Sequence, residues 1–116
     1  MAEGLMMEAG DLDRRITFQR AAETSNELNE PIETWTDLVT VWARRRDASD
    51  GEKVGAGQVG STLMSRFVVR SSEITRDVIP TDRIQHDGRL WNIQGIKEVD
   101  AGRRRFLEIT AIMDAD

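Results

Sequence analysis

The sequence predicts a mainly β protein, a small antiparallel β-barrel of about six strands with one long central loop. Several short segments alternate apolar and polar residues, one Asp-Gly pair marks a tight hairpin, and a glycine-rich stretch at 48–60 separates the strands into two groups. A closed or nearly closed barrel would leave few strand edges exposed. With 116 residues the chain has room for one domain, expected at 9–114 after a flexible leader at 1–8. Met7 is an alternative start.

The first two expected strands form a hairpin. Leu12, Ile16 and Phe18 share one face of the first strand, and residues Ala22 to Pro31 form a polar loop. In the second strand Val39, Val41 and Ala43 alternate with Leu38, Thr40 and Trp42, so both faces carry apolar side chains.

A third strand is expected from Met64 to Ser71. Phe67 and Val69 would point inward from it, and Arg66 and Arg70 outward.

The C-terminal third carries the clearest turn signal. Asp87-Gly88 fits the two central positions of a type I′ turn, where φ is positive at both residues. Trp91 and Ile93 follow at a period of two, which places Trp91 in the core. A second turn at Asp100 to Gly102 leads into a last strand with one apolar face, made of Leu107, Ile109 and Ala111.

The central stretch 48–60 contains four glycines and few apolar residues, so we expect a mobile loop, with one helical turn at Glu52 to Gln58 as an alternative. Gly55 to Gly60 matches the G-x-G-x-x-G pattern of dinucleotide sites by letter only. That chemistry needs a buried strand before the glycines and a helix after them, and the preceding residues 49–53 are polar. A flexible loop is the better interpretation.

Composition narrows the possible functions. The net charge is −5 and the sequence pI about 4.9, whereas proteins that bind nucleic acid tightly are usually basic. The chain has no cysteine, so disulfides and thiolate metal sites are excluded. The first ten residues lack the pattern of a signal peptide, and no apolar stretch approaches about 18 residues, so we expect no membrane association.

No residue pattern predicts an enzyme, a cofactor or a metal. His86 is the only histidine and lies beside a turn, where a solvent-exposed side chain is the usual outcome, and no activated serine motif accompanies it. Glu27, Glu30 and Glu33 lack the spacing of a calcium loop, and we expect them to be solvated.

Apolar residues out of phase with the expected core faces predict contacts with other proteins. Trp42, Leu90 and Phe106 are the main candidates, and Val68, Ile96 and Ile112 share their phase. The arginine triplets 44–46 and 103–105 are solvated strand ends or, alternatively, charged contacts with a neighbouring subunit or DNA phosphate. Arg45 and Arg104 are the candidates in that second case.

Residues 7 to 113 together resemble the small head-closure proteins of long-tailed phages, also called head–tail joining proteins or stoppers. Single motifs are unspecific, and their order and spacing carry the resemblance. They are Ala9-Gly-Asp-Leu12, Arg15-Ile-Thr-Phe-Gln-Arg20, Pro31 with Thr34-Trp35, Val41-Trp-Ala43, Gly57-Gln-Val59, Phe67-Val-Val-Arg70, Asp82-Arg-Ile84, Asp87-Gly-Arg-Leu-Trp-Asn-Ile93 and Arg104-Arg-Phe-Leu-Glu-Ile109. The leader and the glycine-rich loop, which is more often helical in relatives, depart from the pattern.

The resemblance implies a virion structural protein, assembled in the host cytoplasm of a phage, prophage or gene transfer agent. It would be one subunit of a six- or twelve-fold ring that closes a DNA-filled head. The portal or adaptor would lie on the head side, and the tail terminator or tail tube on the tail side. Double-stranded DNA would pass weakly and non-specifically through the channel. The loop residues Gly51, Lys53, Gly55, Gly57 and Gln58 would be candidate channel residues.

Two other functions compete with this interpretation. A neighbouring tail component, such as a terminator or minor tail protein, would also be a small β-rich ring former. A barrel that binds single-stranded nucleic acid would need aromatic residues on a basic face, and the net charge of −5 weighs against it.

Overall fold

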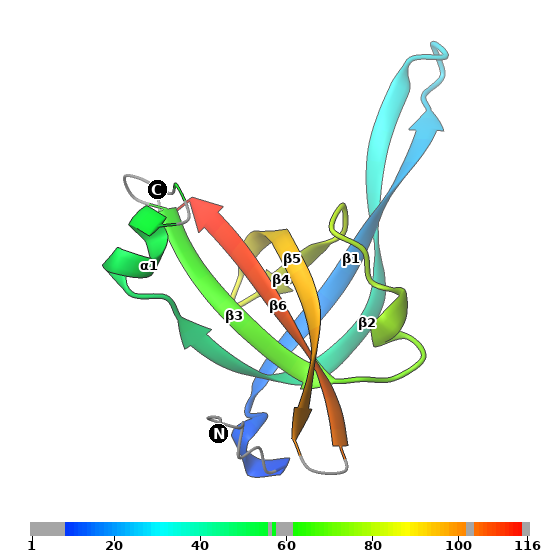
Figure 1. Cartoon of the computed structure of the whole chain (residues 1–116). Helices are drawn as coiled ribbons and strands as arrows, with labels where there is room; N and C mark the ends of the chain where they lie inside the picture. The colour runs from blue at the N-terminus through cyan, green and yellow to red at the C-terminus, as the bar shows by residue number, and fades with distance from the viewer. Residues whose placement is uncertain (1–8, 56, 58–61, 102–103, 115–116) are drawn as a thin grey trace.

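The computed structural model describes residues 9–55, 57, 62–101 and 104–114, and the expected leader at 1–8 lies outside them. Six antiparallel strands form one closed barrel in the order β1-β2-β3-β6-β5-β4 (Figure 1). The strands are β1 (Arg14–Ser25), β2 (Pro31–Asp47), β3 (Thr62–Arg70), β4 (Arg83–His86), β5 (Arg89–Ala101) and β6 (Arg104–Asp114). Three short helices complete the description: the 3-10 helices η1 (Ala9–Asp11) and η2 (Thr75–Asp77), and the α-helix α1 (Asp50–Gly55). The predicted fold class is confirmed.

The barrel closes where β4 pairs with β1. This seam contains only three residue pairs, Thr17 with Gln85, Phe18 with Ile84 and Gln19 with Arg83. The connection from β3 to β4 passes through η2 and carries the chain across the barrel to reach that position. Closure satisfies the backbone groups that an open sheet would expose at its edges.

The core fills the barrel interior with the side chains that alternation predicted, and Ile84 joins them. Ile16, Phe18, Phe67, Val69, Ile84, Trp91, Ile109 and Ala111 are each at most 1% exposed. The rings of Phe67 and Trp91 meet edge to face, with centroids 5.3 Å apart. Burying side chains of this size stabilises a fold by about 1.5–3 kcal/mol each before conformational entropy is subtracted.

A β-bulge explains why both faces of the second strand looked apolar. Phe18 pairs with Val39 but the next residue, Gln19, pairs with Asp37, so Leu38 is an extra residue on β2. Leu38 and Val39 therefore both pack against the core. The strict alternation expected across Leu38 is wrong at this position.

The face assigned to Leu12 is also wrong. Because β1 begins only at Arg14, the period of two does not extend back to Leu12. The Leu12 side chain therefore lies on the outer side of the barrel. There it packs with Val68 and Phe106 in a second, smaller core. Phe106 is out of phase with β6 as predicted, but it is 2% exposed. The chain itself covers that surface, so Phe106 presents none to a partner.

The expected loop from Ala22 to Pro31 shrinks to residues 26–30, and the residues on either side of it belong to β1 and β2. The Asn26 side chain organises the turn, because its Oδ1 accepts hydrogen bonds from the backbone N–H groups of Leu28 and Glu30 at 2.8 and 2.9 Å. Asn29 adopts φ 61°, the left-handed conformation that Asn tolerates. Residues 21–35, here called the arm, form a two-stranded ribbon that projects from the barrel (Figure 1).

The Asp87-Gly88 turn is confirmed. The two residues have φ of 56° and 74° and join β4 directly to β5. At the second predicted turn Ala101 pairs with Arg104, and residues 102 and 103 lie outside the described part of the chain.

Candidate interaction surface

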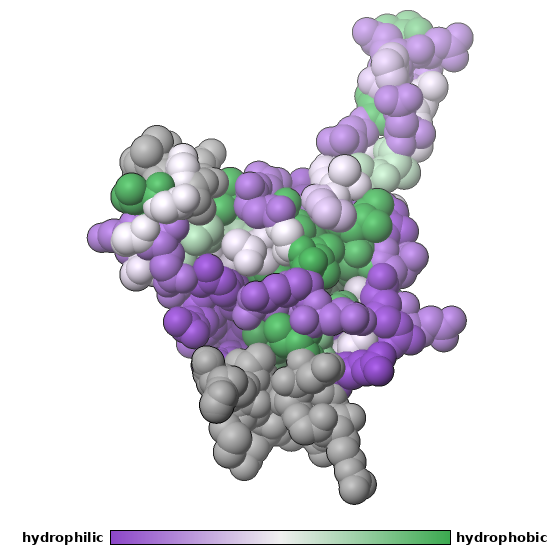
Figure 2. Space-filling view, in the orientation of Figure 1, coloured by the Kyte–Doolittle hydropathy of each residue, from purple (hydrophilic) through white to green (hydrophobic). Residues whose placement is uncertain are grey.

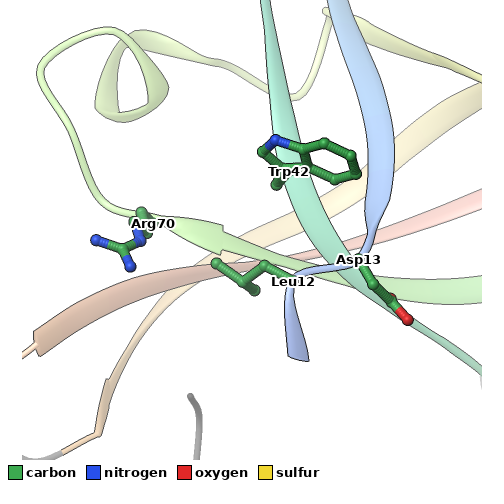
Figure 3. Close-up of a pocket in the computed structure, with 4 residues that line it drawn as sticks. All are labelled: Leu12, Asp13, Trp42 and Arg70. Carbon is green, nitrogen blue, oxygen red and sulfur yellow. The ribbon is translucent and has the colours of Figure 1, made fainter. Parts of the chain in front are cut away.

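Trp42 lies on the outside of the barrel beside a groove. Its side chain is 51% exposed, and the Arg15 guanidinium lies over the indole at 4.7 Å from the ring centroid. A hollow of about 680 Å³ is lined by Leu12, Asp13, Trp42 and Arg70 (Figure 3). An adjoining hollow of about 340 Å³ shares three of these residues and adds Arg15, Thr40, Val41, Ser72 and Thr75. We call these lining residues the Trp42 groove.

Both walls of the groove are held by the barrel. The Leu12 wall is fixed by its packing on Phe106 and Val68. The opposite wall is fixed by Thr75, which is 2% exposed; its hydroxyl donates to the Arg70 carbonyl at 2.8 Å and accepts from the Ser72 N–H at 2.7 Å. The groove is therefore preformed, which lowers the entropy cost of binding a partner.

The charges at the groove are mostly positive. Figure 3 shows Arg70 on one side of Leu12 and the Asp13 carboxylate pointing away on the other. Asp13 lies 3.9 Å from Arg14, which partly neutralises it. An apolar floor flanked by two arginines suits a segment with an apolar side chain next to carboxylates.

The other candidate contact residues do not join this surface. Leu90 is 47% exposed, but β1 and β4 lie between its strand and that of Trp42, so the two are about 14 Å apart across the sheet. The Arg45 guanidinium lies over the Trp91 ring at 5.0 Å and binds Asp47 at 2.9 Å within the same chain. Arg104 pairs with Ala101 through its backbone, and its side chain lies outside the described part.

The central stretch contains the helix α1, which begins two residues and ends three residues earlier than the expected turn at Glu52 to Gln58. Ser49 and Glu52 cap it reciprocally: the Glu52 N–H donates to Ser49 Oγ at 3.2 Å, and the Ser49 N–H donates to Glu52 Oε1 at 3.1 Å. The Ser-x-x-Glu spacing is visible in the sequence and would have predicted the helix start.

Two side chains connect α1 to β3. Lys53 Nζ donates to the Thr62 carbonyl at 3.2 Å, and Arg66 Nη1 binds Glu52 at 2.7 Å. Hydrogen bonds from the Ser49 N–H and from Arg66 lower the pKa of Glu52. The candidate channel residues Gly51, Lys53 and Gly55 thus lie on this helix. Gly57 follows it with φ 79°, and Gln58 lies outside the described residues.

The G-x-G-x-x-G letters begin in this helix. Gly55 ends α1, and most of the following residues of the pattern lie outside the described part. A helix rather than a buried strand precedes the glycines, so the arrangement lacks the strand-to-helix turn of a dinucleotide site.

The prediction of a solvent-exposed His86 is wrong. His86 is 7% exposed, because alternation on β4 sends it inward with Ile84. Its Nδ1 lies 2.9 Å from the Arg15 carbonyl, and its ring meets Phe67 edge-on at 5.5 Å. A carbonyl only accepts hydrogen bonds, so Nδ1 carries the proton. His86 supports the barrel, and its period of two from Ile84 was the signal in the sequence.

Two further findings concern metal sites and membrane spans. Within the residues that the structure describes, no three acidic or histidine side chains gather as a metal site would require, and Glu27, Glu30 and Glu33 are exposed on the arm. No helix among those residues is long and apolar enough to span a membrane.

Comparison with known proteins gives a consistent result. Residues 7–113 match the family profile described as phage head completion protein. The solution structure of a protein from Shigella flexneri 2a is similar, with 33% identity, a TM-score of 0.67, and coverage of 95% of this chain and 99% of that one. A chain in the virion of a native gene transfer agent particle has the same fold, with 23% identity, a TM-score of 0.61, and coverage of 87% and 93%. Comparison with curated protein sequences finds no significant match.

Proposed function

Because the chain belongs to the phage head completion protein family, it has a structural role in the virion, and we propose that it acts as a subunit of the head-closure ring. This ring joins the portal or adaptor of a DNA-filled head to the tail and helps to retain the DNA. Its neighbours are the portal or adaptor on the head side and the tail terminator or tail tube on the tail side.

The half-exposed Trp42 is the single observation that best supports this proposal. A tryptophan that keeps 51% of its surface in solvent, beside a preformed groove, has the character of an interface anchor rather than of a core residue. Its indole already has the Arg15 guanidinium over the ring, which leaves less of it for stacking on nucleic acid bases. A protein-binding surface therefore accounts for Trp42 better than a single-strand nucleic-acid site does.

The experiment replaces Trp42 by Asp in a phage or gene transfer agent that encodes this chain. We expect heads that lack tails and lose DNA to added nuclease, measured by electron microscopy and by protected DNA per particle. Ile79→Asp is the matched control, because Ile79 is 47% exposed and does not line the groove. Wild-type numbers of tailed, DNA-filled particles after complete deletion of the gene would refute the proposal.

The glycine-rich stretch is the part of the subunit that we assign to the channel. Gly51, Lys53, Gly55, Gly57 and Gln58 would line or gate the path of DNA. Lys53 is already bonded to the Thr62 carbonyl and to Asp50, so any contact that it makes with DNA phosphate would be weak. Deleting residues 53–58 should leave the barrel folded, because β2 and β3 pair independently of them. Mutant particles should then lose DNA. Full yields of DNA-filled particles would make the loop a passive spacer.

A further inference from the structure

The net negative charge of the chain is concentrated in one place. Residues 21–37, which are the arm and its base, hold five carboxylates and no Lys or Arg. The whole chain has 21 acidic and 16 basic residues, so the remainder has sixteen of each and is neutral. The acidic arm is thus a distinct electrostatic feature on an otherwise balanced body.

The arm also exposes apolar side chains that nothing in the described chain covers. Leu28 at the tip is 77% exposed and Ile32 is 43% exposed, and residues 22–34 are all exposed. Figure 2 shows a mostly hydrophilic ribbon with apolar surface at its tip. An isolated two-stranded ribbon is only marginally stable in water, so an arm of this length gains order from being bound.

The Trp42 groove has the complementary chemistry. Leu12 and Trp42 offer an apolar floor for Leu28, and Arg15 and Arg70 offer cations for carboxylates beside it. Glu27 directly precedes Leu28, and Glu30 follows it by two residues. The match therefore combines an apolar contact with charge complementarity, the pair of features that fixes partner choice at interfaces.

An arm cannot reach the groove of its own subunit. Arg15, at the groove, and Ser25, near the tip, lie on the same strand β1 and are ten residues apart, which is about 33 Å along the strand. Trp42 and Pro31 are separated in the same way on β2. Any arm that occupies this groove must belong to another copy.

We propose that the acidic arm of each subunit docks in the Trp42 groove of the next copy of this chain. The two surfaces differ, so the contact is head-to-tail and leaves one free arm and one free groove at the ends of any open chain of subunits. Repetition with the right rotation closes a ring. This inference rests on the proposed ring and names the contact that builds it.

The absence of cysteine permits a clean cross-linking test. A full-length variant carries Glu27→Cys at the tip and Thr40→Cys at the groove, both exposed positions. At millimolar concentration under mild oxidation, we expect a ladder of covalent oligomers on a non-reducing gel. A disulfide needs Cα atoms within about 7 Å, so a bond within one subunit is excluded. The matched control pairs Glu27→Cys with Arg46→Cys, an exposed position outside the groove, and should give at least tenfold less ladder.

Directionality is tested by dividing the surfaces between two chains. One chain carries Glu27→Cys with Trp42→Asp, and the other carries Thr40→Cys with Leu28→Asp. A head-to-tail contact predicts a covalent heterodimer and no covalent homodimer, with a yield that falls at least threefold as salt rises and screens the charges.

Three results would overturn the proposal: no ladder with the first pair, an equal ladder with the control pair, or links only between two arm tips. If a different protein binds the groove, the purified chain would give the first result, no ladder. Any of the three results would leave the head-closure function standing if the chain is still found in tailed particles.

Discussion

Arg20 and Asp82 form a bidentate salt bridge across the seam of the barrel. Arg20 Nε and Nη2 donate to the two carboxylate oxygens of Asp82 at 2.9 and 3.0 Å, and the Asp82 side chain is 1% exposed. The same carboxylate accepts the Ile79 N–H at 2.9 Å. These bonds fasten β1 to the segment before β4 where the strands themselves share only three residue pairs.

The first prediction concerns this ion pair. Asp82→Asn should lower the free energy of unfolding by about 2–3 kcal/mol, because a charge-assisted hydrogen-bond pair is lost from a buried position. Asp77→Asn is the control: Asp77 also binds Arg20, at 3.1 Å, but is 68% exposed and should cost less than about 1 kcal/mol. Urea unfolding measures both. Equal losses would show that the seam does not depend on burial of the Asp82 carboxylate.

The second prediction concerns the Asp87-Gly88 turn. Gly88 has φ 74°, a conformation that a β-branched residue strongly disfavours, so Gly88→Val should cost about 1–3 kcal/mol of stability. Gly51 lies within α1, and a Cβ atom added there would meet only Ser49 Oγ, at 3.9 Å. Gly51→Ala should therefore be neutral or stabilising by up to about 1 kcal/mol. Thermal and urea unfolding compare the two. A Gly88→Val protein as stable as the parent would contradict the observed turn.

The third prediction separates two residues that share one phase on their strands. Phe106→Asp places a carboxylate among Leu12 and Val68 and should cost more than about 3 kcal/mol, since Phe106 is 2% exposed. Leu90→Asp should change stability by less than about 0.5 kcal/mol, since Leu90 is 47% exposed. Circular dichroism during urea unfolding measures both. A folded, stable Phe106→Asp protein would show that the second core contributes little.

Short sequence patterns correctly predicted most core faces of the strands and the Asp87-Gly88 hairpin. Alternation placed Phe67, Trp91 and Ile109 in the core, and the Asp-Gly pair placed the hairpin, because each depends on residues adjacent in sequence. The arm was missed because polar residues look alike in a loop and in a ribbon exposed on both faces. A ribbon of this kind is held by cross-strand pairs such as Thr24 with Thr34, which a single strand does not reveal.

The candidate surface was predicted only in part, for a related reason. Trp42 was identified from its phase, but the groove beside it needs Leu12 and Arg70, which are 58 residues apart in the sequence and meet only after the barrel closes. Phe106 had the same phase as Trp42 and proved buried. Phase tells which side of a sheet a residue faces, and not what covers that side.

The last prediction concerns acid. The pKa of Glu52 is lowered from its usual value of 4.5 by the Ser49 N–H and by Arg66. Burial acts to raise the pKa of Asp47 at the end of β2, but hydrogen bonds from Ser65 and Arg45 outweigh it and lower the pKa below 3.8. A carboxylate with a lowered pKa stabilises the folded state at a pH above its usual pKa. That stabilisation is lost as the pH falls through the folded-state value.

Stability should therefore decline as the pH falls below about 4.5, with α1 released from β3 as Glu52 loses its charge. Glu52→Gln should be less stable than the parent near pH 7, and the difference should shrink toward zero as the parent's Glu52 becomes protonated. Urea midpoints across this range measure it, with Glu23→Gln on the exposed arm as the control. A difference between parent and Glu52→Gln that stays constant with pH would mean that the substitution acts through packing, and that the charge of Glu52 does not hold the helix.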